Sequence, residues 1–72
     1  MKRTKVTSSL IASLGYKPNT QTLEVEFTDT GHVYQYFDVP NREFLRLINA
    51  KSLGRYFSFN IKDEYRYIKI RP

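Results

Sequence analysis

The chain has 72 residues, which is enough for one domain and too few for two. It contains no cysteine and one histidine, which excludes a disulfide framework and a zinc site built from these two residue types. The six tyrosines and five phenylalanines are therefore the expected source of core packing. No stretch approaches the roughly 20 apolar residues of a membrane span, and we expect a cytoplasmic protein.

Residues 1–5 are expected to form a solvated, frayed start, followed by a single domain over residues 6–72. Apolar or small residues alternate with polar ones over residues 9–16, 22–27 and 32–37, which predicts three strands. In the first strand this alternation places Ile11 on the face opposite Leu14. Gly31 favours a turn between the second and third strands, because glycine adopts a positive φ readily.

The region after Pro40 carries helical signals. Residues 41–50 place Phe44, Leu47 and Ile48 on one helical face, and Ser52 is a suitable cap for a second helix over 53–63. Gly54 inside that helix is unfavourable by about 1 kcal/mol relative to alanine, which indicates that something packs closely there. Residues 64–70 read as a short extended tail or an edge strand. The expected fold is α+β: a small three-stranded antiparallel sheet, then two helices packed on one face, then a short extended C-terminal tail.

The position of Tyr34 and Tyr36 depends on the length of the turn before them. A turn of two or four residues pairs Val25 with Tyr36 and places both tyrosines in the core under the helices. A turn of three residues moves them to the outer face beside Glu24 and Glu26, where the carboxylates would repel a phosphate backbone. We expect the core position.

No catalytic or cofactor motif is present. The chain lacks both the GxGxxG and the GxxxxGK[ST] phosphate-loop patterns, and a lone His32 beside a turn glycine reads as an exposed turn residue. Asp63 and Glu64 are adjacent, so they would point apart on a helix and form a poor acid–base pair. We therefore expect a protein that is not an enzyme and uses neither cofactor nor metal.

Basic residues are concentrated in the second half of the chain. Residues 1–36 carry four basic and three acidic side chains, whereas residues 37–72 carry eight and four. Basic side chains hold phosphates and exposed aromatics stack on unpaired bases, so we expect a small module that binds RNA or single-stranded nucleic acid. The candidate phosphate contacts are Arg42, Arg46, Lys51, Arg55, Lys62, Arg66, Lys69 and Arg71, and the candidate stacking residues are Tyr65 and Tyr67.

A protein-interaction module that docks on a larger protein machine is the alternative. Ile11, Val33 and Phe37 are expected on the sheet face without helices, where an apolar patch would attract a protein partner. In that case the basic face would serve solubility alone.

A set of short motifs, in a fixed order along the chain, also resembles a known family, the KTSC domain. The resemblance is carried, in order, by Ser8-Ser9, Ile11, Gly15-Tyr16, Leu23-x-Val25-x-Phe27, Tyr34-x-Tyr36, Val39-Pro40, Ala50-x-Ser52-x-Gly54, Tyr56-Phe57, Ile61-Lys62 and Tyr65-x-Tyr67. It implies a short module of the kind found at the C-terminus of some lysyl-tRNA synthetases and alone in bacterial and phage proteins. It suggests RNA binding by association and brings no catalytic residues with it.

Overall fold

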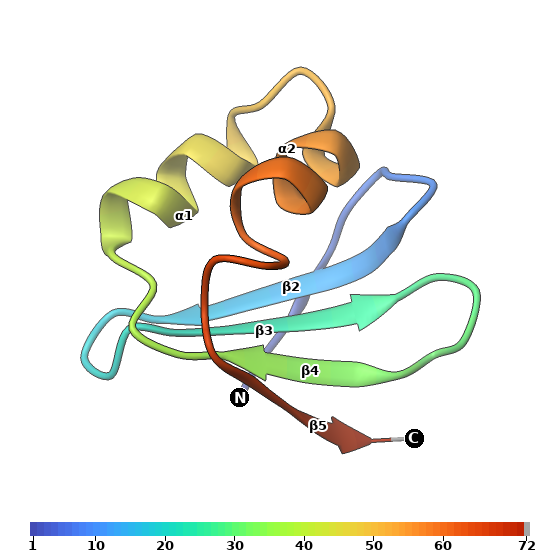
Figure 1. The fold of residues 1–72 in the computed structure, drawn as a ribbon. Coiled ribbons are helices and arrows are strands. Elements are labelled where there is room, and N and C mark those ends of the chain that lie inside the picture. The colour runs from blue at the N-terminus through green and yellow to red at the C-terminus, as the bar shows by residue number, and fades with distance from the viewer. Residues whose placement is uncertain (72) are drawn as a thin grey trace.

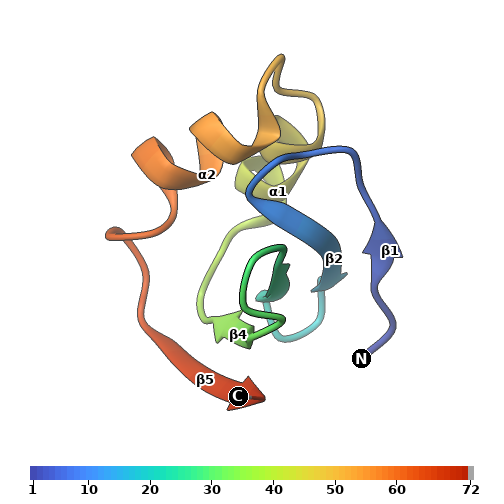
Figure 2. The same ribbon diagram turned by 90° about the vertical axis from the view of Figure 1, so that its right-hand side faces the viewer.

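Five strands form one antiparallel sheet, and two helices cover one of its faces (Figure 1 and Figure 2). The structure is a computed structural model that describes residues 1–71. Its elements in chain order are β1 (Thr4–Lys5), β2 (Ile11–Lys17), β3 (Thr22–Phe27), β4 (Val33–Tyr36), α1 (Asn41–Ile48), α2 (Leu53–Asn60) and β5 (Tyr67–Arg71). The strands lie side by side in sequence order, and the helix pair is inserted between β4 and β5.

The prediction of a three-stranded sheet is wrong, because both ends of the chain add a strand. The segment read as a tail or an edge strand is an edge strand: β5 pairs with β4, with Tyr67 opposite Tyr36 and Lys69 opposite Tyr34. β1 lies within the segment that was expected to be frayed and pairs with β2. The α+β class is confirmed. Pro72, the last residue of the predicted domain, lies outside the described residues.

Gly15 allows the N-terminal segment to lie directly against β2. An ideal Cβ atom on Gly15 would stand 2.6 Å from the carbonyl oxygen of Lys2, a separation that real Cβ atoms do not show. The absence of a side chain at this position therefore lets the chain before β1 approach the sheet closely.

A β-bulge in β2 places Ile11 in the core. The register shifts between Ile11 and Ser13, and both Ile11 and Leu14 belong to the buried cluster. Strict alternation had placed Ile11 on the opposite face. That expectation is wrong because a bulge adds one residue and reverses the phase of the strand before it.

The two tyrosines of β4 face the helices, as predicted. Leu23 lies opposite Tyr36 and Val25 lies opposite Tyr34, so the pairing is displaced by two residues from the expected one and the face is unchanged. Tyr36 is buried, whereas Tyr34 is partly exposed. The predicted positive φ at Gly31 is confirmed, with a value of 73°.

The second helix is capped as the sequence predicts. The Ser52 Oγ accepts a hydrogen bond of 3.3 Å from the backbone N–H of Arg55, and α2 ends at Asn60 rather than at the predicted residue 63. Phe57 within α2 and Ile61 directly after it are both fully buried. In α1 only Leu47 is fully buried, and Ile48 is 45% exposed, contrary to its predicted place on the buried face.

A polar network covers the sheet face opposite the helices. Glu24 is only 3% exposed, forms an ion pair with Arg3 and accepts a hydrogen bond of 2.9 Å from the Gln35 side chain. Burial acts to raise the pKa of Glu24, but the hydrogen bonds from Gln35 and Arg3 and the charge of Arg3 outweigh it, so the pKa is lowered. The N-terminal segment is thereby fastened to the sheet through a buried carboxylate.

Candidate functional site

The predicted phosphate contacts are exposed cations, and most of them form no ion pair within residues 1–71. All eight of the predicted basic residues are exposed. Arg66 alone among them has an acidic partner, Asp38, at 2.9 Å, and both of these side chains are largely exposed. Arg66 also lies over the ring of Phe37, with 5.9 Å from its guanidinium carbon to the ring centre. The other seven cations therefore remain available to an anionic ligand.

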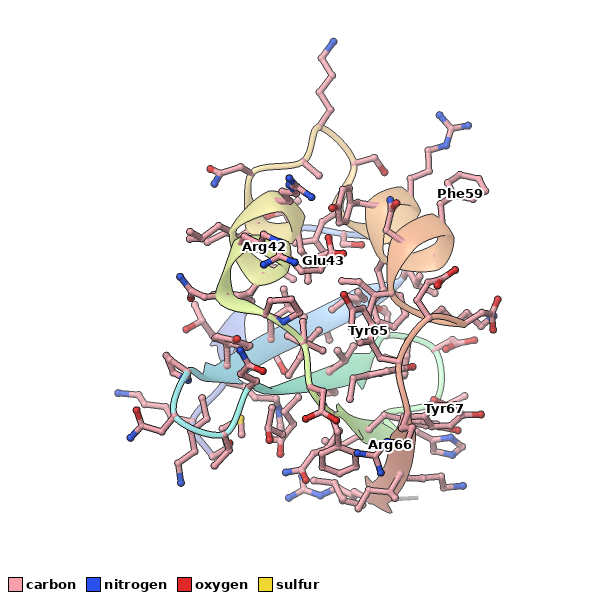
Figure 3. The ribbon with its side chains drawn as sticks, turned by 60° about the vertical axis from the view of Figure 1, so that its left-hand side comes forward. Arg42, Glu43, Phe59, Tyr65, Arg66 and Tyr67 are labelled. Carbon is pink, nitrogen blue, oxygen red and sulfur yellow. The ribbon has the colours of Figure 1, made fainter. Side chains whose placement is uncertain are left out.

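Arg42 and Arg46 lie on α1, the helix that also carries Glu43; Arg42 and Glu43 are labelled in Figure 3. The hydroxyls of Tyr56 and Tyr65 both donate to Glu43. Burial and the nearby charge of Glu43 raise the pKa of Tyr65, and the charge of Arg42 opposes that rise. Tyr65 is thus partly buried, and its hydroxyl ties it to α1.

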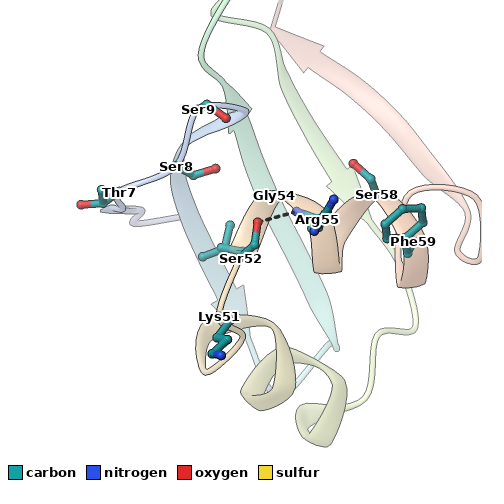
Figure 4. A pocket seen from close by; sticks show the side chains of 10 residues that line it. Thr7, Ser8, Ser9, Lys51, Ser52, Gly54, Arg55, Ser58 and Phe59 are labelled. Carbon is teal, nitrogen blue, oxygen red and sulfur yellow. Dashed lines mark hydrogen bonds between the residues drawn. The ribbon is translucent and has the colours of Figure 1, made fainter.

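Lys51 and Arg55 line a groove between α2 and the loop before β2 (Figure 4). The groove has a volume of about 550 Å³. Its lining residues are Thr7, Ser8, Ser9, Lys51, Ser52, Leu53, Gly54, Arg55, Ser58 and Phe59. Five of these carry hydroxyls, two are cations and none is acidic, so the groove presents hydrogen-bond donors and positive charge together.

The groove is shaped by a close approach of α2 to the loop. An ideal Cβ on Gly54 would lie 3.1 Å from the Ser8 Oγ and 3.2 Å from the Leu10 Cβ, which confirms the close packing predicted from this glycine. The Ser8 Oγ in turn accepts hydrogen bonds from the backbone of Leu10 and Ile11. Both walls of the groove are therefore held by local contacts.

Phe59 is the aromatic residue that the sequence reasoning missed. It lies at the rim of the groove and is 76% exposed, more than any other large hydrophobic residue that the structure describes (Figure 3). A signal was available in the sequence, because Phe59 falls outside the apolar stripe formed by Leu53, Phe57 and Ile61. An aromatic side chain on the polar side of a helix is free to contact a ligand.

Lys62 and Tyr67 line a second hollow, an aromatic cleft of about 310 Å³. The lining residues are Leu10, Phe27, Asp29, Thr30, His32, Tyr34, Tyr36, Lys62, Asp63 and Tyr67. The ring centres of Tyr34 and Tyr67 are 5.4 Å apart, and Tyr67 is 53% exposed. The cleft adjoins the groove along the chain, because Ser9 lines the groove and the next residue, Leu10, lines the cleft.

The remaining basic residues of β5 lie on different faces of the sheet. Lys69 is paired with Tyr34, so its side chain lies on the face of the aromatic cleft. Arg71 is opposite Val33, which pairs with Glu26 on the outer face. The predicted residues thus come from α1, the groove, the edge of the cleft and the outer face of the sheet.

The three residues expected to form an apolar patch on the sheet face without helices are largely covered. Ile11 and Val33 have no exposed surface, and Phe37 is half-buried beneath Arg66. The bulge in β2 accounts for the burial of Ile11. Of these three residues, only Phe37 therefore keeps any exposed surface.

Residues 1–71 hold neither a metal-binding cluster nor a membrane-spanning helix. They contain no group of three acidic or histidine side chains that could hold a metal ion. Neither helix in this part of the chain has the length and apolar character needed to cross a bilayer.

The fold defines a class of small α+β domains in which a helix pair covers one face of a five-stranded antiparallel sheet. The chain belongs to the KTSC domain family, whose model matches residues 7–65. A crystal structure of a KTSC domain protein from Yersinia pestis is similar, with a TM-score of 0.91, 40% identity and 96% of each chain covered.

Two relatives place the domain in different contexts. A protein of unknown function from Stutzerimonas stutzeri is 46% identical over 71 residues, which cover 97% of this chain and 99% of the relative. A lysine–tRNA ligase from Nostoc sp. is 44% identical over 63 residues, covering 88% of this chain and 11% of the ligase. The domain therefore occurs as nearly a whole chain and as a small part of a much larger protein.

Proposed function

We propose that this protein is a non-enzymatic module that binds single-stranded RNA, with the groove beside α2 as its phosphate-binding site. The observation that carries the proposal is the combination of Lys51, Arg55 and the exposed ring of Phe59 in one groove that contains no acidic residue. Single strands are bound by grooves that combine positive charge with aromatic rings, because the charge follows the backbone and the rings stack on bases.

The hydroxyls of the groove add to this proposal. Serine and threonine side chains are common phosphate contacts, together with arginine and lysine. Ser9 and Ser58 line the same groove as the two cations, so a phosphate there has neutral donors as well as charged ones. The relationship to a lysine–tRNA ligase, a protein whose name includes tRNA, favours RNA over DNA.

The groove and the cleft together form the proposed path of a strand. Lys51 and Arg55 hold phosphates in the groove, and Lys62 and Lys69 supply cations at the edge of the cleft for the adjoining phosphates. Arg42 and Arg46 lie outside the groove on α1, which also carries the carboxylate of Glu43, so we expect their contribution to be weaker and to act at longer range. The sequence carries no helix-turn-helix signature, so we do not expect either helix to read the major groove of duplex DNA.

Two charge-matched double variants test this assignment. We expect Lys51→Ala with Arg55→Ala to weaken binding of a labelled 12-nucleotide RNA roughly tenfold and to reduce the salt slope by about 1.4, since each lost phosphate contact removes about 0.7. Arg42→Ala with Arg46→Ala removes the same charge and should have a smaller effect on both quantities. Fluorescence anisotropy at several salt concentrations measures them.

Phe59→Ala separates stacking from charge in the same titration. Loss of one stacked base costs about 1–3 kcal/mol of binding free energy, and it should leave the salt slope unchanged. Because Phe59 is exposed, circular dichroism should show the variant folded. Equal losses for the two charge variants, together with no effect of Phe59→Ala, would refute the groove as the binding site.

A further inference from the structure

The aromatic cleft differs from the groove in the charge of its polar groups. The groove contains cations and hydroxyls without an acid, whereas the cleft has two carboxylates, Asp29 and Asp63, beside aromatic walls and one lysine. Two carboxylates in a hollow of this size oppose the entry of a phosphate. The cleft therefore suits an uncharged ligand with a flat apolar surface and donors at its edge.

The aromatic walls of the cleft are built for such a surface. Tyr34 and Tyr67 lie side by side, and Phe27 contacts Tyr34 at 5.4 Å between ring centres in an edge-to-face arrangement. Tyr36 is buried against Tyr67 and Phe57, which holds the position of the exposed Tyr67 ring. A volume of about 310 Å³ is at the lower end of the range for ligand pockets.

We propose that this cleft takes one unstacked base that carries an exocyclic amino group, such as cytosine, and holds it against Tyr67 with its amino group directed to Asp29 or Asp63. Carboxylates accept hydrogen bonds from the amino group of cytosine, whereas uracil has a carbonyl oxygen at the same position. Lys62 and Lys69 lie beside the cleft, where they contact the adjoining phosphates. This inference rests on the proposed RNA binding and adds a preference for the base.

Nucleotide titrations followed by ¹H–¹⁵N NMR test the cleft on the intact protein. CMP and UMP differ at the group that would face the carboxylates, and ribose 5-phosphate reports phosphate binding without a base. We expect CMP to shift the amides of His32, Tyr34 and Tyr67 and to bind roughly fivefold more tightly than UMP. Ribose 5-phosphate should shift the amides of Lys51 and Arg55 instead.

Substitutions identify the groups responsible. Asp29→Asn with Asp63→Asn should remove the preference for CMP, whereas Asp38→Asn, which also removes an exposed carboxylate but lies outside the cleft, should retain it. Tyr67→Ala should weaken both nucleotides roughly fivefold, and Tyr67→Phe, which keeps the ring, should bind as the unchanged protein does.

Equal affinities for CMP and UMP, or CMP shifts confined to the groove amides, would overturn this inference. The proposed function would be judged separately, because RNA binding through the groove is measured by anisotropy and by the Lys51 and Arg55 variants. Absence of RNA binding together with specific CMP binding would instead contradict the groove and retain the cleft.

Discussion

At the scale of single residues, Glu24 connects the N-terminal segment to the sheet. Its carboxylate is nearly inaccessible and is held by Arg3 and Gln35 on the face opposite the helices. The alternation of residues 22–27 predicted that this side chain would point outward from the core, and it does. Its burial could not be predicted, because the covering residue, Arg3, belongs to a segment without a local structural signal.

Glu24 makes stability depend on pH. Its folded-state pKa is lowered, so its contribution is present above the unfolded value of about 4.3 and is lost as the pH falls through the folded value. We expect Glu24→Gln to reduce the free energy of unfolding by about 1–3 kcal/mol at pH 7, because a charged hydrogen-bonded partner is removed. The difference should shrink as the pH falls toward and through the lowered folded-state pKa, where the wild-type carboxylate also becomes neutral.

Urea denaturation at pH 7 and pH 3 measures this difference. Glu64→Gln is the matched control, because Glu64 is exposed and should change stability little at either pH. A Glu24→Gln effect of the same size at both pH values would show that the charge of Glu24 is not what stabilises the sheet.

At the scale of elements, local signals predicted the structure where one residue determines a turn or a cap. Ser52 and Gly31 act within a few residues of their own positions, and the strand over residues 22–27 was predicted with its observed bounds. The pairing of β5 with β4 escaped prediction, because the helix pair separates the two strands in sequence and alternation does not identify a partner. The bulge in β2 escaped for a related reason, since a single inserted residue has no clear sequence signal.

The cap of α2 provides a test at this scale. Ser52→Ala removes the acceptor for the backbone N–H of Arg55, and we expect it to lower stability by about 1 kcal/mol. Ser58→Ala is the control, because Ser58 is an exposed residue within the same helix and alanine favours helix formation. Chemical denaturation followed by circular dichroism measures both, and equal effects of the two substitutions would contradict the capping role.

At the scale of the whole molecule, the basic residues that are in excess in the second half of the sequence lie at several sites. The second half contributes α1, α2 and β5, and these elements lie over the sheet and along its edge (Figure 1 and Figure 2). The predicted cations therefore separate by element, although every one of them is exposed. The sequence predicted which side chains would reach solvent, but the division between groove and cleft depends on how α2 packs against the loop before β2.

The division gives the proposed RNA site two parts with different chemistry. Lys51 and Arg55 lie with hydroxyls in the groove, whereas Asp29 and Asp63 lie with aromatic rings in the cleft. The first arrangement favours phosphates and the second favours a base, so together they fit a flexible single strand better than a rigid duplex. The central claim is thus that electrostatic attraction supplies most of the affinity for single-stranded RNA, and that the groove is the main phosphate-binding site.

The most direct measurement is the salt dependence of binding between the wild-type protein and a labelled single-stranded RNA. If the four cations of the groove and cleft each contact a phosphate, the logarithm of the association constant should fall with the logarithm of salt concentration with a slope of about −3. A 16-base-pair RNA duplex should bind more weakly at each salt concentration. Failure to detect saturable binding at 50 mM salt, or binding that does not respond to salt, would contradict the account.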